Sequence, residues 1–260
     1  MSVAIGSVVA IIGAILGSFL GVVVTRYGTR EGFVSGRSRC DACRKNIAWY
    51  DNIPLISFIL LRGRCRHCGA NIAAWVAAIE WVTAAVSVAV VYCVLQLFPE
   101  TAVRDSLIIL TMAAALIVVA FYDLRTMYVP LRAVFVADAA LVMWWSVHPP
   151  VWGDVIGGAL IAGGVPAFLS IVSRERWMGS GDAYISVIGG ALFGVYGAVL
   201  YLTVAFGLGA VIGIALIIAG IKTRRDPIPF GPFLVCAIGV LAVVQCVAPS
   251  ALRYGSGMVY

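Results

Sequence analysis

Two aspartates, Asp123 and Asp182, each stand at one end of a long apolar run. Asp182 follows a Gly-Ser-Gly segment, whose glycines let other backbone approach closely. Two carboxyl groups within a few ångströms cannot both ionise easily, so such a pair holds a single proton. The ionised member can take a proton from water while the protonated member polarises a peptide carbonyl. The two residues are therefore a candidate aspartic peptidase pair.

Other readings of these acids stay open at this point. A single aspartate at the end of a membrane span is often only solvated, and the functional reading depends on both residues lying at the same depth. Asp138 lies inside a span, and we interpret it as a structural polar contact. Glu80 lies two helical turns into its own apolar run, so it could support the site or bind a substrate.

Four of the seven cysteines form two Cys-x-x-Cys pairs separated by 21 residues, Cys40 with Cys43 and Cys65 with Cys68. This spacing is typical of a tetrahedral zinc site. Four protein ligands leave no open coordination position, so the expected Zn²⁺ is structural. His67 is interpreted as a bystander, and the other three cysteines lie in apolar runs where ordinary packing explains them.

The elements that must position these residues are membrane spans. Hydrophobic residues make up 62% of the 260 residues and charged residues 12%, which a soluble domain of this length could not bury. The first run, 3–24, is read as a retained span rather than a signal peptide. We expect an all-α polytopic membrane protein, a single domain over 1–260 with a cytoplasmic four-cysteine zinc loop over 26–72. About eight spans are expected, at 3–25, 73–98, 106–122, 131–148, 154–173, 183–196, 198–221 and 230–248.

The basic residues predict the orientation. With the N-terminus outside, all of the 18 Lys and Arg residues except Arg104 and Arg253 fall on the cytoplasmic side, as the positive-inside rule requires. Asp123 and Asp182 then share the cytoplasmic face, and the cysteine loop lies where disulfides are disfavoured. The short apolar run 52–61 in that loop either lies on the membrane surface or packs on the helix bundle.

Motifs along most of the chain resemble those of the bacterial type IV prepilin peptidases. The most specific is the cysteine loop, and the others are spread from the first span to the last. In chain order they are "GSFLGVVVTR" at 17–26, "CDACRKNIAWYDNIPLISFILLRGRCRHCG" at 40–69, "IEWVTA" at 79–84, "YDLRTMYVP" at 122–130, "GSGD" at 179–182 and "IPFGPFL" at 228–234.

The resemblance implies a membrane aspartic peptidase that removes the basic leader from prepilins or pseudopilins. It implies Asp123 and Asp182 as the catalytic pair and the four loop cysteines as zinc ligands. Many members also methylate the new N-terminus with S-adenosylmethionine, and the loop pattern suggests Glu80 and Gly63 for that cofactor. The expected location is the bacterial inner membrane, with the active site on the cytoplasmic side and no nucleic-acid partner.

Three positions depart from the family pattern. Gly21 replaces an asparagine, Asp41 replaces a proline, and Tyr184 replaces a lysine two residues after Asp182. The last change removes a cation beside the expected catalytic acid, which affects substrate preference rather than the reaction type. The alternative from another class is a transporter or non-catalytic assembly factor with a zinc docking module.

Overall fold

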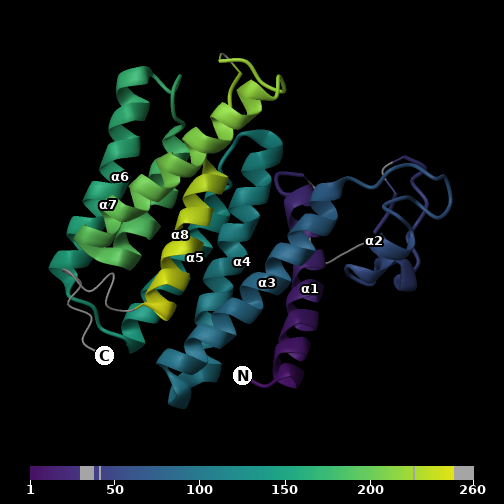
Figure 1. Ribbon diagram of the computed structural model, residues 1–260, viewed down its shortest axis with the longest axis horizontal. Coiled ribbons are helices and arrows are strands. Elements are labelled where there is room, and N and C mark those ends of the chain that lie inside the picture. Colours follow the sequence, from purple (N-terminus) through teal and green to yellow (C-terminus); the bar gives the residue numbers. More distant parts are fainter. Residues whose placement is uncertain (30–37, 41, 225, 249–260) are drawn as a thin grey trace. The chain divides into compact units, whose positions relative to one another are not determined.

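The computed structural model describes residues 1–29, 38–40, 42–224 and 226–248, so Asp41 and Arg253 lie outside the described residues. The described residues form helices, turns and two isolated β-bridges, which confirms the all-α prediction. The chain divides into two compact units, Met1–Leu95 and Gln96–Tyr260 (Figure 1). The prediction of a single membrane domain over 1–260 stays a prediction.

The first unit pairs helix α1 (Val3–Arg26) with helix α3 (Ala74–Leu97). The two backbones approach closely because a methyl group at Gly17 would lie only 2.7 Å from the Cα atom of Glu80, a contact that small residues make possible between membrane helices. The loop between them carries the short 3-10 helix η1 (Trp49–Asn52) and helix α2 (Ile56–Leu60), which is far too short to span a bilayer.

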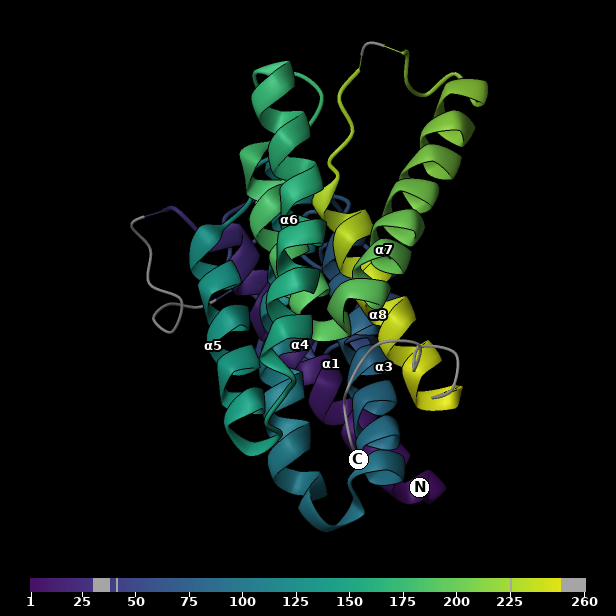
Figure 2. The same cartoon turned by 90° about the vertical axis from the view of Figure 1, so that its left-hand side faces the viewer.

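The described part of the second unit is a bundle of five α-helices, shown from the side in Figure 2. Its buried core is built from aliphatic side chains of α4, α5, α7 and α8 such as Val119, Val134, Ile188 and Leu234. The helices, in chain order, are α4 (Ala102–Thr126), α5 (Leu131–Val147), α6 (Trp152–Ser173), α7 (Ser180–Ile218) and α8 (Gly231–Val247).

Helix α7 breaks at Gly194, the one residue of the helix with non-helical backbone angles (φ 69°, ψ −171°). Glycine tolerates this positive φ without a steric penalty. The amide N–H of Val195 is freed by the break and donates to Oδ1 of Asp154 at 2.9 Å. Beyond the break the chain turns back. The ring of Tyr201 lies against Gly189, whereas a straight helix would separate these two residues by about 18 Å.

The number of spans differs from the expectation. Five described helices are long and apolar enough to cross a bilayer, and α5 and α8, with 17 residues each, are shorter. The break predicted within 194–197 coincides with Gly194, but α7 counts as one helix of 39 residues. The protein is therefore a multi-pass membrane protein, and the count of eight spans is not confirmed.

Candidate active site

Asp123 lies in the last turn of α4, and the residue is 4% exposed. The turn ends at Met127, whose left-handed backbone lets its N–H donate to the carbonyl of Asp123 at 2.8 Å. The backbone N–H of Gly231, at the start of α8, donates to Oδ2 of the same aspartate at 2.9 Å. A buried carboxylate thus has a fixed donor from a second helix, which holds its rotamer.

Asp182 lies in the first turn of α7 and is 6% exposed. Gly179 is the N-cap residue of the helix, and its carbonyl accepts the backbone N–H of Asp182 at 3.2 Å. Asp182 thus lies in the first helical turn, whose backbone N–H groups have no partner within the helix. The Gly-Ser-Gly segment therefore presents the carboxyl at a helix N-terminus, as the sequence suggested.

The structure brings the two aspartates together. Gly181 packs against Val129 in the segment that follows α4, and a methyl group at Gly181 would lie 2.6 Å from the Cβ atom of Val129. This contact sets the start of α7 beside the end of α4, and the carboxyl groups of Asp123 and Asp182 are close enough for their charges to interact. A buried, interacting carboxyl pair can share a proton and act as acid and base.

Two buried hydroxyl groups near Asp182 were missed by the sequence reasoning. Ser186 follows Asp182 by one helical turn, and Tyr201 lies on the returning half of α7 with its ring against Gly189. The two hydroxyls lie near each other, but neither makes a hydrogen bond of good geometry with the described residues, and both residues are fully buried. The only available signal was the spacing of four residues from Asp182 to Ser186, which places both side chains on one helix face.

The four loop cysteines converge in the first unit. Their sulfur atoms all lie within 4.8 Å of one another, and the sulfurs of Cys40 and Cys68 are 3.8 Å apart. Tetrahedral zinc–thiolate bonds of about 2.3 Å require sulfur separations of about 3.8 Å. The donor set and its geometry fit Zn²⁺ with no position left for substrate or water.

The two cysteine pairs are held by matching turns. The N–H of Cys40 donates to the carbonyl of Lys45, and the N–H of Cys65 donates in the same way to the carbonyl of Ala70. Backbone N–H groups of Cys68 and His67 point at the sulfur of Cys65 and lower the pKa of its thiol, whereas burial and the neighbouring thiols raise the pKa of Cys68. A thiol with a lowered pKa is more readily present as the thiolate that a metal binds.

Glu80 and Gly63 each have a contact that supports the loop. The backbone N–H of Leu55 donates to Oε2 of Glu80 at 2.8 Å, and Glu80 is buried in α3. Gly63 has a positive φ of 65°, and its carbonyl accepts the N–H of Ile72 at 2.7 Å. Neither contact tests a role in binding a methyl donor, which stays a prediction.

The bundle of apolar helices identifies a membrane-embedded protein, and the buried carboxyl pair at its helix ends is a candidate acid–base site. Residues 11–94 match the family model of the bacterial peptidase A24 N-terminal domain, and residues 110–214 match that of the type IV leader peptidase family. The chain belongs to the type IV leader peptidase family.

Three relatives have similar sequence identity to this chain. A prepilin leader peptidase/N-methyltransferase of Bacillus subtilis is 29% identical over 87% of this chain and 89% of the relative. Proteins of the same name from Aeromonas salmonicida and Myxococcus xanthus are each 31% identical over 80% of this chain. The match covers 71% of the Aeromonas protein and 62% of the Myxococcus protein. No solved structure matches the chain.

Proposed function

We propose that the protein is an aspartic endopeptidase that removes the basic leader from prepilins or pseudopilins. The observation that carries the proposal is the buried pair of Asp123 and Asp182. Gly231 fixes the carboxyl of Asp123, and the packing of Gly181 on Val129 sets the start of α7 beside the end of α4. The family membership supports the substrate class, since the named relatives are prepilin leader peptidases. The site is proposed to face the cytoplasm from the inner membrane, because the basic residues gather at that end.

The pair can carry both proton transfers of peptide hydrolysis. We assign the ionised role to Asp123, because a carboxylate is stabilised by the N–H that Gly231 donates. Asp123 takes a proton from a water molecule, whose oxygen attacks the scissile carbonyl carbon. Protonated Asp182 gives its proton to the carbonyl oxygen. The proton on Asp123 then passes to the leaving amine as the C–N bond breaks, and a hydroxyl of the tetrahedral intermediate returns its proton to Asp182.

The decisive experiment replaces each aspartate by asparagine, which keeps the volume and loses the acid. Asp123→Asn and Asp182→Asn should each abolish cleavage of a purified prepilin, while both variants stay folded in the membrane. Asp138→Asn is the matched control and should cleave like the unchanged protein. Cleavage by either active-site variant at a near-normal rate would refute the peptidase and favour a transporter or an assembly factor.

We propose that Zn²⁺ in the four-cysteine site is structural. Cys40, Cys43, Cys65 and Cys68 would hold it, and when bound it cross-links the two ends of a loop that has little core of its own. The residues of the loop therefore organise the first unit and take no part in proton transfer.

We propose a second activity, methylation of the new N-terminus with S-adenosylmethionine. The names of the relatives support it, and Glu80 offers a buried carboxylate that binds the N–H of Leu55, in the same loop as Gly63. A carboxylate attracts the sulfonium charge of such a donor. No Gly-rich fingerprint of a soluble methyltransferase is present in the sequence, so the binding residues would all come from this loop and α3.

Mass spectrometry of the cleaved product tests this activity directly. Incubation with S-adenosylmethionine should add one methyl group to the new N-terminal amine, and Glu80→Gln should remove that gain while cleavage continues. Gly63 has a positive φ, which serine adopts only with strain, so Gly63→Ser can disturb the fold of the loop. The zinc content of this variant must therefore be measured together with its methylation. A free amine at saturating donor would leave the protein a peptidase only.

A further inference from the structure

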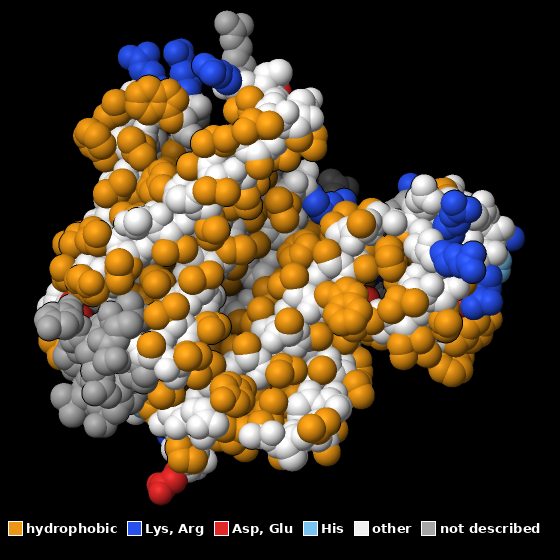
Figure 3. Space-filling model, in the orientation of Figure 1, with side chains coloured by type: hydrophobic (Ala, Val, Ile, Leu, Met, Phe, Trp, Pro, Cys, Tyr) orange, Lys and Arg blue, Asp and Glu red, His pale blue; other side chains and the backbone are white. Residues whose placement is uncertain are grey.

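The loop of the first unit has an apolar edge and a basic edge. Its exposed apolar side chains are concentrated between residues 49 and 60, and Trp49, Ile59 and Leu60 are 81%, 62% and 75% exposed. Hydrophobic side chains gather on the lower edge of the loop in Figure 3, which faces the N-terminal end of α1, and Lys and Arg side chains gather above and outside them. Soluble loops rarely expose so many large apolar side chains together.

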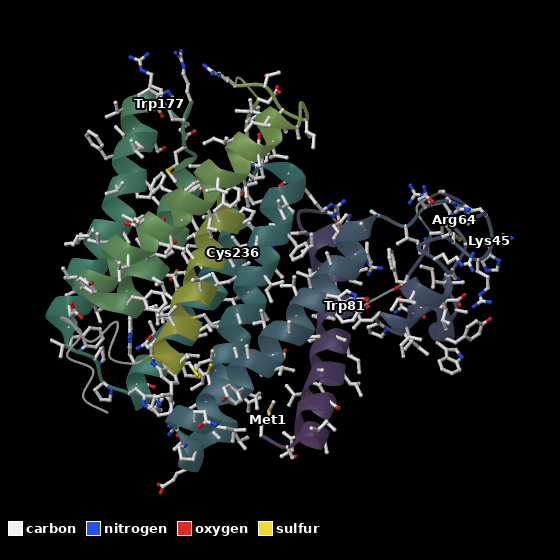
Figure 4. All side chains as sticks on the ribbon, viewed as in Figure 1. Met1, Lys45, Arg64, Trp81, Trp177 and Cys236 are labelled. Atoms are coloured by element: carbon white, nitrogen blue, oxygen red, sulfur yellow. The ribbon has the colours of Figure 1, made fainter. Side chains whose placement is uncertain are left out.

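The basic edge lies on the far side of the loop from α1 and α3. Arg64 and Lys45 mark it in Figure 4, and no ion pair among the described residues involves either of them. Arg66, by contrast, pairs with Asp51 and stacks over the ring of Tyr50, so its charge is already partnered. The free charges are therefore available to an anionic partner outside the chain.

A hydrogen bond fixes the depth of the apolar edge. Leu55, the residue before α2, donates its backbone N–H to Glu80, the seventh residue of α3. Six helical steps place Glu80 about 9 Å along α3 from its first residue. Amphipathic segments at a bilayer surface bury their apolar face about 5–10 Å into the boundary between headgroups and acyl chains. The loop thus sits at the depth where an interfacial segment would.

We propose that this loop is an in-plane membrane anchor that binds the anionic leaflet of the bilayer. The apolar edge around Trp49, Ile59 and Leu60 inserts among the upper acyl chains, and Lys45 and Arg64 contact lipid phosphates. Aromatic residues at the interface and basic residues beside anionic headgroups are the established pattern for such a contact. The hydrogen bond from Leu55 to Glu80 then connects the anchor to the transmembrane helix α3.

The test is hydrogen–deuterium exchange of the full-length protein in two kinds of vesicle. One contains phosphatidylcholine alone, and the other contains equal amounts of phosphatidylcholine and phosphatidylglycerol. Peptides covering 53–61 should be protected in both and more strongly in the anionic vesicles. Ile59→Asp with Leu60→Asp, at two exposed positions, should speed their exchange about tenfold in either vesicle, because carboxylates are costly to bury in lipid.

Charge-neutral variants test the basic edge. Lys45→Gln and Arg64→Gln should each reduce the extra protection in anionic vesicles by about fivefold, and Arg176→Gln, a matched loss of charge in the second unit, should have no effect. Zinc content reports whether each variant is folded. As a second measurement, acyl-chain-brominated lipids should quench a fluorescence component that Trp49→Phe removes. Unchanged exchange in the double aspartate variant, or no effect of vesicle charge, would overturn the proposal without bearing on the peptidase site.

Discussion

The backbone N–H of Gly231 donates a hydrogen bond of 2.9 Å to Oδ2 of Asp123, across 108 residues of sequence. A methyl group at Gly231 would lie 2.7 Å from the same oxygen. The backbone at this position supplies the donor, and the absence of a side chain leaves the space that the carboxylate occupies. The final-span motif "IPFGPFL" is thus part of the site and not only of the membrane scaffold.

Gly231→Ala should lower kcat for prepilin cleavage by about tenfold or more, because the added methyl group displaces the carboxylate of Asp123. The cost in stability should be about 1–3 kcal/mol, as for other overpacked positions. The measurement is steady-state cleavage together with thermal unfolding in detergent. Gly239→Ala, on the same helix and with open space around it, is the control and should keep full activity.

Gly181→Ala should also reduce cleavage, because its methyl group would collide with Val129 and push the start of α7 away from α4. Val129→Ala keeps the Cβ atom but removes the γ-methyl group that lies equally close, at 2.6 Å, so the double variant should recover part of the lost activity. The quantity to measure is the coupling energy between the two substitutions, which is expected for residues in direct contact. Strictly additive effects would show that this contact does not set the position of Asp182.

Zinc should co-purify at about one ion per chain, the stoichiometry of a single four-cysteine site, and Cys65→Ser should lower that content. We expect chelation to reduce the folded yield and the melting temperature more than the intrinsic rate, because the ligands lie in the first unit and both aspartates in the second. Cys236→Ser, outside the cluster, is the control. Elemental analysis that finds no zinc in a reduced, freshly prepared sample would contradict the site.

Tyr201→Phe should leave the melting temperature unchanged or raise it, because the substitution removes a buried hydroxyl that has no partner among the described residues. A clear loss of stability in Tyr201→Phe would mean that the hydroxyl makes a bond in the membrane, for instance to a buried water.

Gly189→Ala should lower the melting temperature, because its methyl group would lie 2.6 Å from the ring of Tyr201.

The sequence was informative wherever chemistry depends on local spacing. The two Cys-x-x-Cys pairs predicted a cluster that the structure shows, and "GSGD" marked a carboxyl at a helix N-terminus. The break near Gly194 was also predictable, because 39 apolar residues exceed the length of one span. Each of these features needs only a short stretch of chain to be recognised.

Contacts between distant segments could not be predicted in the same way. Nothing near Gly231 in the sequence points to Asp123, and the packing of Gly181 on Val129 depends on the path of the whole bundle. Tyr201 lies in an apolar run, and no spacing in the sequence indicates that its ring packs against Gly189. The span count was uncertain for a related reason, since lengths of 17 residues are short for a bilayer and depend on how neighbouring helices tilt.

The hairpin of α6 and the first half of α7 has a mechanical consequence for the site. Gly158 and Gly190 bring the two backbones into contact, Gly163 accommodates Val187, and Asp154 binds the chain at the break. These close contacts hold the two helices together along their length, with Asp182 at the end of the pair. We therefore expect the spacing of the two carboxyl groups to depend on the segment from Met127 to Pro130, which places Val129 against Gly181.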